Sequence, residues 1–128
     1  MPWRHGVCHE AGGNPTYQKV LDRVIERQVE MIAQMARDLA DVPEGDGTML
    51  DSTLFLYGTG ISDSNTHFHD DLPIALVAGK STGITGGRYV RYSEGTPLAN
   101  LHVSILEKLG TPVETFGDST GVLKHLST

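Results

Sequence analysis

Two apolar segments separated by a polar loop stand out in the hydrophobic pattern of this chain. Residues 53–57 and 72–78 are each rich in apolar side chains, and the second run is nearly continuous. Runs of this length predict strands, and an uninterrupted apolar run is typical of a strand buried on both faces. Functional side chains are often found on polar loops at the edge of an α/β sheet. We therefore expect the rest of the chain to be organised around this strand-loop-strand unit.

Amphipathic helices are expected on both sides of the unit. Apolar residues recur every three or four positions from about residue 15 to about residue 41, which predicts one long helix with an apolar face. Asn14 can cap this helix, and Pro15 suits its first position. The same periodicity predicts a second helix over residues 97–109, capped by Thr96.

Further strands complete the expected architecture. The alternating segment 88–92 predicts a third strand near a sheet edge, and residues 113–116 predict a short strand in the tail. This order of elements favours an α/β fold, with a small, partly parallel sheet flanked by helices. Residues 1–128 are expected to form a single domain. Because the first histidine motif comes almost at the start of the chain, we expect this domain to be a C-terminal fragment of a larger α/β domain.

Composition and charge narrow the classes of partner. The 128-residue chain carries a formal net charge of −6, which gives no basic footprint for nucleic acid or an anionic membrane. No apolar run approaches the roughly 18 residues that a membrane-spanning helix needs. Cys8 is the only cysteine, so the chain has no internal disulfide. An anionic substrate would need a local positive centre, such as a metal ion, Arg88 or Arg91.

Four of the six histidines fall into two short clusters that carry the candidate chemistry. Imidazole nitrogens and carboxylate oxygens are standard ligands of zinc, iron and manganese. A His-x-His pair in an extended backbone projects both rings on one side of the chain. Histidines four residues apart share a face only in a helix, and Gly6 argues against a helix in the first cluster. The candidate metal ligands are His5, His9, Glu10, Asp63, His67, His69 and Asp70, with Asp71 as a further ligand or supporting partner.

Simpler interpretations of these residues stay open. Exposed loops collect His and Asp side chains by chance, and the spacing alone fixes no site with three or four ligands. His102 lies on the apolar face of the second helix, where a histidine is more often a packed core or interface residue than a ligand. His125 is expected to be exposed.

Nucleophilic catalysis by Cys8 is a further alternative. The neighbouring His9 can activate a thiol if the two side chains meet. Adjacent residues of an extended backbone point in opposite directions, which favours an inert cysteine. The chain contains no nucleophile elbow, and its order of residues defines no Ser-His-Asp triad.

Several sequence blocks follow one another in a fixed order along nearly the whole chain. They are His5-Gly6-Val7-Cys8-His9-Glu10, the segments 43–51 and 56–60, His67-Phe68-His69-Asp70-Asp71-Leu72-Pro73, and the segments 95–101 and 116–121. Together these blocks resemble the C-terminal part of the HXXSHH-motif family, bacterial proteins of unknown function. Where the family motif ends in Ser-His-His, this chain has Cys8, His9 and Glu10, and glutamate can still ligate a metal.

The resemblance implies a specific chemistry. The family is similar to the alkaline-phosphatase-like superfamily of α/β/α enzymes, which often use two bound metals to hydrolyse phosphate or sulfate esters. By that analogy His67 and His69 would be the first-choice ligands of a divalent metal such as zinc, manganese, iron or calcium, with His5 and His9 nearby. The expected partner is an anionic small-molecule ester. Family members are generally exported, so a periplasmic or extracellular location is expected.

Two functions of different kinds therefore follow from the sequence. The chain is either part of a metal-dependent phosphate- or sulfate-ester hydrolase or a non-catalytic structural or binding module of an exported bacterial protein. In the first case the histidines bind a catalytic metal, whereas in the second they hold loops together by hydrogen bonds or bind a structural ion. The reacting centre of such a hydrolase would be incomplete in this chain, because the superfamily draws its nucleophile and several ligands from upstream segments.

Overall fold

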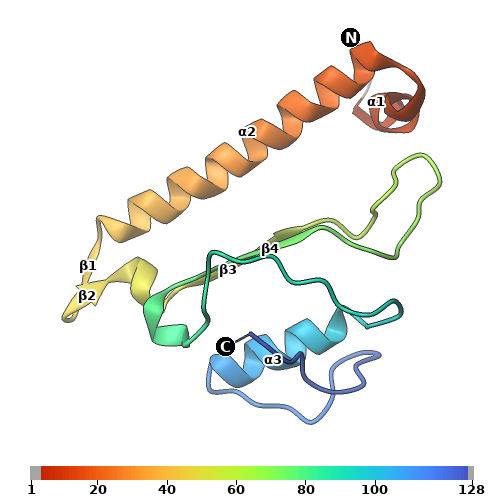
Figure 1. Cartoon of the computed structure of the whole chain (residues 1–128). Helices are drawn as coiled ribbons and strands as arrows, with labels where there is room; N and C mark the ends of the chain where they lie inside the picture. Colours follow the sequence, from red (N-terminus) through yellow and green to blue (C-terminus); the bar gives the residue numbers. More distant parts are fainter. Residues whose placement is uncertain (1–3, 127–128) are drawn as a thin grey trace.

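The computed structural model describes residues 4–126 of the chain (Figure 1). A long helix lies on one side of a two-stranded ribbon, and a shorter helix lies on the other side. The elements are α1 (Arg4–Glu10), η1 (Ala11–Gly13), α2 (Pro15–Ala40), β1 (Pro43–Glu44), β2 (Gly47–Thr48), η2 (Met49–Ser52), β3 (Leu54–Gly58), β4 (Ile74–Ala78), η3 (Lys80–Thr82) and α3 (Ala99–Lys108), where η denotes a 3-10 turn.

The expected α/β fold with a partly parallel sheet is wrong. Residues 4–126 form a small α+β domain with three α-helices and two separate antiparallel sheets of two strands each, β1–β2 and β3–β4. The two strands expected at 53–57 and 72–78 do form, as β3 and β4, but Leu54 pairs with Ala78 and Gly58 with Ile74, so they run in opposite directions.

The loop between β3 and β4 explains this antiparallel pairing. A parallel pair needs a crossover connection, usually a helix, that returns the chain to the starting edge. Residues 59–73 contain no helix, and a bridge between Asp63 and Phe68 folds the loop back on itself. The chain therefore reverses at the loop tip, and β4 returns beside β3 as the second arm of a hairpin.

Helix α2 confirms the expected long helix. The Asn14 side chain accepts a 3.0 Å hydrogen bond from the Thr16 N–H, and Pro15 occupies the first position. The side of α2 that faces the ribbon is half-buried, and the Tyr57 hydroxyl on β3 donates a 3.0 Å hydrogen bond to Oε1 of Gln28. No residue of α2 is fully buried, so the helix covers the ribbon without being enclosed by it.

The segment that carries the first histidine cluster is a helix, contrary to the sequence expectation. Val7 and Ala11, one turn apart, are both buried, and α1 and η1 contact α2. A glycine inside a helix costs about 1 kcal/mol relative to alanine. Burial of two apolar side chains outweighs that cost at Gly6, and the helix brings His5 and His9 onto one face.

The third and fourth expected strands do not form. Residues 88–92 and 113–116 have no ladder partner among the described residues. In the first segment, Arg91 and Tyr92 instead make side-chain hydrogen bonds to Asp71 and to the backbone of Lys124. An alternating pattern predicts a strand only where one face can be buried, and the side chain of Tyr89 is 85% exposed.

Helix α3 confirms the expected second helix with shorter bounds. Its N-cap is Leu98, while the Thr96 hydroxyl donates to the Ser93 carbonyl and does not cap the helix. The buried apolar side chains of α3 are Ala99, Leu101 and Val103.

The tail is tied across α3 by two buried polar residues. The Asn100 amide binds Thr120, and Ser104 Oγ accepts a 2.7 Å hydrogen bond from the Leu123 N–H. Among the helices of residues 4–126, none has the length and hydropathy needed to cross a lipid bilayer.

Candidate functional site

Three of the predicted ligands come together at the end of the β3–β4 hairpin. His5 and His9 lie one turn apart on α1, with ring centroids 4.6 Å apart. The ring of His67, from the hairpin loop, lies edge to face with that of His9 at a centroid distance of 4.9 Å. The two histidine clusters, far apart in the sequence, therefore share one location, with His9 between the other two rings.

The loop that carries His67 is shaped by its own polar side chains. Asp63 Oδ1 accepts hydrogen bonds from the N–H groups of Asn65 (2.8 Å) and Thr66 (3.4 Å). The Ser62 N–H and the Phe68 N–H complete the turn by bonding the Phe68 and Asp63 carbonyls. His67 itself adopts a left-handed backbone with φ of 56°, which is uncommon for a residue other than glycine.

The carboxylate of Asp63 stabilises this turn by accepting hydrogen bonds from its backbone. The Asn65 N–H, supported by that of Thr66, lowers the pKa of Asp63 below its ordinary value. Asp63 is thus ionised at neutral pH with one oxygen already engaged by the backbone. This placement makes Asp63 a residue that shapes the loop, and it is not grouped with the three imidazoles.

His69 is oriented by a backbone contact. Its Nδ1 lies 2.6 Å from the Gly60 carbonyl oxygen, and because a carbonyl can only accept, Nδ1 carries the hydrogen. The Nε2 lone pair of a neutral His69 is then left for another partner. Histidines that ligate metals commonly donate their second ring nitrogen to a carbonyl in this way, yet no ring contact joins His69 to His9 or His67 among the described residues.

The remaining acidic candidates lie at the margins of the site. Glu10 and Asp70 are exposed. Asp71, in a left-handed backbone with φ of 54°, forms a 2.9 Å ion pair with Arg91. This ion pair holds the Arg91 guanidinium beside the base of the histidine loop. Arg88 is also exposed.

The spacing of the three imidazoles can be compared with the spacing of histidine ligands around a metal ion. Two imidazoles that ligate one zinc ion at about 2.0–2.1 Å have ring centres roughly 5 Å apart, which is close to the spacing of His9 from His5 and from His67. As they stand, however, no three His, Cys, Asp or Glu side chains of residues 4–126 are grouped to hold one ion. The residues fit a metal in donor chemistry and pairwise spacing, and rotation of an exposed His5 or His67 side chain would be needed for a third ligand.

Cys8 and His102 have plain structural roles. Cys8 is half-buried on α1, and its carbonyl oxygen accepts a 2.7 Å hydrogen bond from Ser64 Oγ. His102 packs edge to face against Phe116 with centroids 5.3 Å apart, as expected for a packed histidine. His125 is exposed, also as expected.

Sequence reasoning missed Ser64, which joins α1 to the histidine loop. A serine in a polar loop carries no signal of a contact to a residue 56 positions upstream. It also missed the left-handed backbone of His67, for which the surrounding turn residues are a weak signal.

Comparison of the chain with models of protein families, with curated proteins and with solved structures found no match. The likeness to the HXXSHH-motif family therefore stays a prediction. The site is described by its own geometry alone.

Proposed function

We propose that this chain binds a divalent transition-metal ion through His5, His9 and His67 and serves as the metal-binding part of a phosphate- or sulfate-ester hydrolase. The observation that carries the proposal is the 4.9 Å approach of the His67 ring to that of His9. Imidazole clusters of this kind are typical ligands of zinc and of other transition metals, including iron.

The surrounding contacts support a ligand role. Ser64 fixes the loop to α1 through the Cys8 carbonyl, so His9 and His67 are held in place by the backbone of both segments. His69, with Nδ1 bonded to the Gly60 carbonyl, has the tautomer of a metal ligand and is a candidate to join the set through Nε2.

Substrate recognition in this proposal depends on charge. The chain is acidic, with a formal net charge of −6, so an anionic ester needs a local positive centre. Arg91 is held near the loop by Asp71 and would bind a phosphate or sulfate oxygen there. The chemistry that a metal supplies in such sites is polarisation of the ester oxygen.

A second candidate function is a non-catalytic module in which the same residues hold the loop. The hydrogen bonds of Asp63 and His69 within the loop favour it, because they tie these side chains to the loop's own backbone. In that case the histidines pack against one another and bind no ion.

Metal binding can be measured with a matched pair of histidine variants. His67 and His125 both adopt left-handed backbones, with φ of 56° and 73°, and asparagine tolerates this conformation. We expect the wild-type protein and His125→Asn to bind zinc stoichiometrically by isothermal titration calorimetry, with metal content checked by mass spectrometry. His67→Asn should bind at least about tenfold more weakly, as expected for loss of a ligand.

The outcome also separates the two candidate functions. Absence of zinc, manganese or iron binding by the wild-type protein, with unchanged unfolding in chelator, would favour the loop-holding module. Binding that is equally weakened in both variants would contradict the assigned ligands. Binding of inorganic phosphate and sulfate by the metal-loaded protein, weakened in Arg91→Ala, would support the anionic-substrate part of the proposal.

A further inference from the structure

Segment 91–96, the first turn of α3 and the tail surround a cavity of about 360 Å³. Hydrogen bonds hold its walls together. The Tyr92 hydroxyl donates to the Lys124 carbonyl at 3.0 Å, and the Leu123 N–H donates to Ser104 Oγ on α3 at 2.7 Å. The walls are therefore fixed by the protein itself, as in most small-molecule sites.

The side chains around this cavity are basic. Arg91, Lys124 and His125 line it, and no aspartate or glutamate of residues 4–126 does so. The whole chain has the opposite balance, with 16 acidic residues against 10 lysines and arginines. A local group of cations on an acidic chain favours an anionic ligand, because the field at that place differs in sign from the net charge.

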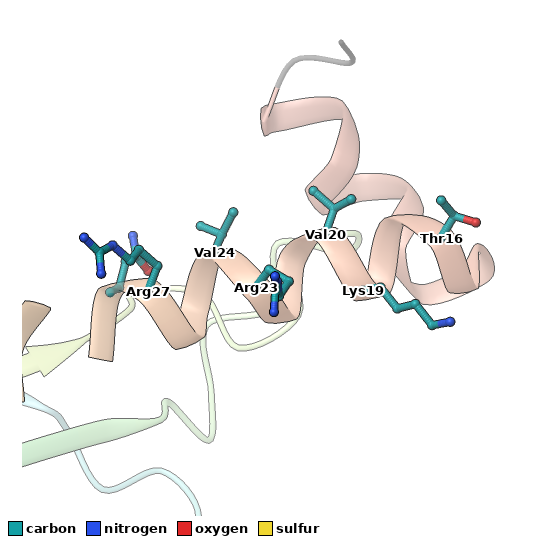
Figure 2. A pocket seen from close by; sticks show the side chains of 7 residues that line it. Thr16, Lys19, Val20, Arg23, Val24 and Arg27 are labelled. Carbon is teal, nitrogen blue, oxygen red and sulfur yellow. The ribbon is translucent and has the colours of Figure 1, made fainter. Parts of the chain in front are cut away.

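A groove on α2 shows the contrasting case (Figure 2). It has a volume of about 770 Å³, and its cations are Lys19, Arg23 and Arg27. Each of them has an acidic neighbour three residues later along the helix. These neighbours are Asp22, Glu26 and Glu30, and Arg27 is paired with Glu30 at 3.1 Å. The α2 groove thus has no excess of positive charge along its helix, and it supplies a matched control for the cavity beside the tail.

The donor groups at the cavity have spare capacity. Among residues 4–126, neither Lys124 Nζ nor Ser93 Oγ makes a hydrogen bond or an ion pair. Arg91 binds Asp71 through Nη2 at 2.9 Å, which leaves its other guanidinium N–H groups for a further acceptor. Glu94, in the same turn as Ser93, is exposed and does not line the cavity. Two cations and one hydroxyl can therefore donate to an anion that carries several oxygens.

We propose that this cavity binds a small phosphorylated molecule, with its phosphate group held by Arg91, Lys124 and the Ser93 hydroxyl. A phosphate monoester carries a charge of about −1.5 to −2 at neutral pH and three acceptor oxygens, which matches two cations and a hydroxyl. Charge-assisted hydrogen bonds from arginine and lysine to phosphate are about twice as strong as neutral ones. A carboxylate carries one charge and would satisfy this group of donors less well.

The size of the cavity indicates that the ligand has an organic part. Small-molecule pockets have volumes of about 300–1,000 Å³, and this cavity, at about 360 Å³, is at the lower end of that range. Val122 and Leu123 also line it and would contact the organic part. The ligand class is therefore the phosphate monoester of a small molecule.

This site goes beyond the proposed function, because it is separate from the imidazole cluster. None of His5, His9 and His67 lines the cavity, and phosphate binding there needs no metal ion. Arg91 belongs to both proposals, so the test relies on Lys124 and on protein freed of metal by a chelator.

The test is calorimetric titration of the metal-free protein with inorganic phosphate and with glycerol phosphate at low ionic strength. We expect one saturable site, with the ester binding at least as tightly as inorganic phosphate. Acetate, a monoanion, should bind at least about tenfold more weakly. Lys124→Met removes the charge and keeps an unbranched side chain. It should raise the dissociation constants of phosphate and its ester at least about tenfold, as expected for loss of a hydrogen bond to a charged group.

The matched control is Lys19→Met in the α2 groove, which makes the same change in net charge and should leave phosphate binding unchanged. Circular dichroism verifies that both variants keep their helices. Amide chemical shifts locate the ligand independently. On addition of phosphate they should move at Ser93, Thr96 and Lys124, and they should stay in place over residues 16–28.

Absence of saturable phosphate binding by the metal-free protein would overturn the proposal. Equal affinities of the wild-type protein and Lys124→Met, or equal losses in Lys124→Met and Lys19→Met, would also overturn it. So would acetate binding as tight as that of phosphate, or an ester that binds more weakly than inorganic phosphate. Zinc titration separates this proposal from the proposed function, because Lys124→Met should keep the zinc affinity of the wild-type protein. Failure of the wild-type protein to bind zinc would contradict the proposed function and leave metal-free phosphate binding intact.

Discussion

The hydroxyl of Ser64 donates a 2.7 Å hydrogen bond to the carbonyl oxygen of Cys8. This contact joins the hairpin loop to α1 immediately before His9, and the loop turns at His67 three residues after Ser64. The bond thus links the two backbones that carry the meeting imidazoles. Ser64, which is not itself a candidate ligand, thereby fixes the position of His9 relative to His67.

Removal of the Ser64 hydroxyl is expected to weaken zinc binding without removing a ligand. Mutation of a residue that positions a metal ligand typically lowers metal affinity by about 10–100-fold. We expect Ser64→Ala to fall at the low end of that range. Calorimetric titration with zinc measures it. Ser62→Ala is the control, because Ser62 Oγ bonds only the Phe68 carbonyl within the same loop. Equal affinities of Ser64→Ala and the wild-type protein would show that the contact to Cys8 does not position the ligands.

Gly79 is required by a close approach of two backbones. It is buried after β4, and a Cβ atom there would overlap the carbonyl oxygens of Leu50 and Asp51 in η2. We expect Gly79→Ala to lower the free energy of unfolding by about 2–3 kcal/mol, as overpacked sites do. Urea denaturation measures the change. The control is Gly86→Ala, where a Cβ meets nothing within 4 Å and stability should be unchanged or raised by up to about 1 kcal/mol. Similar curves for both variants would contradict the assigned contact.

Local patterns in the sequence predicted the elements better than their arrangement. The period of α2 and the cap at Asn14 are local features, and the helix begins at the predicted Pro15. The direction of β4 relative to β3 depends on how residues 59–73 turn, and that depends on hydrogen bonds of Asp63 that hydropathy does not encode. The strand expected at 88–92 does not form, because Arg91 and Tyr92 bond Asp71 and Lys124 and the segment pairs with neither strand of the β3–β4 ribbon.

In the candidate site too, local sequence patterns predicted the residues better than their arrangement. The spacing of His5 and His9 places them together once α1 is known to be helical, but Gly6 argued against that helix. The helix forms because Val7 and Ala11 are buried, a tertiary effect that local propensity does not contain. The meeting with His67 was predicted as a convergence of two clusters, and the structure brings three of the candidate ligands together while Asp63 and His69 bond the loop backbone.

Asn100 is expected to hold the tail against α3. Its side chain is nearly fully buried, with Oδ1 accepting from the Thr120 N–H at 2.7 Å and Nδ2 donating to Thr120 Oγ1 at 3.1 Å. Asn100→Ala would remove both hydrogen bonds that this buried side chain makes to Thr120, so we expect a loss of about 1–3 kcal/mol in unfolding free energy. Hydrogen exchange should accelerate over residues 120–126. The control is Asn65→Ala at an exposed position, which should change the unfolding free energy by less than about 0.5 kcal/mol. Unchanged hydrogen exchange over the tail in Asn100→Ala would contradict the role of Asn100 in holding the tail against α3.

Acid sensitivity should depend on Asp51. Its carboxylate lies 2.8 Å from Lys80 Nζ and accepts a 2.8 Å hydrogen bond from the Thr48 N–H. The hydrogen bond that Lys80 donates, together with the one from the Thr48 N–H, lowers the pKa of Asp51 below the ordinary 3.8. A group with a lowered folded pKa stabilises the protein above its unfolded pKa, and this contribution is lost as the pH falls through the folded pKa.

The isosteric variant Asp51→Asn isolates the charge, because its amide oxygen can still accept from Thr48. At neutral pH we expect the variant to be less stable than the wild-type protein. Below about pH 3.8 the difference should shrink as the wild-type carboxylate is protonated. Urea denaturation at a series of pH values measures both free energies, with the exposed Asp46→Asn as the control. A difference between wild type and Asp51→Asn that stays constant through the acid range would show that the ion pair with Lys80 does not stabilise the fold.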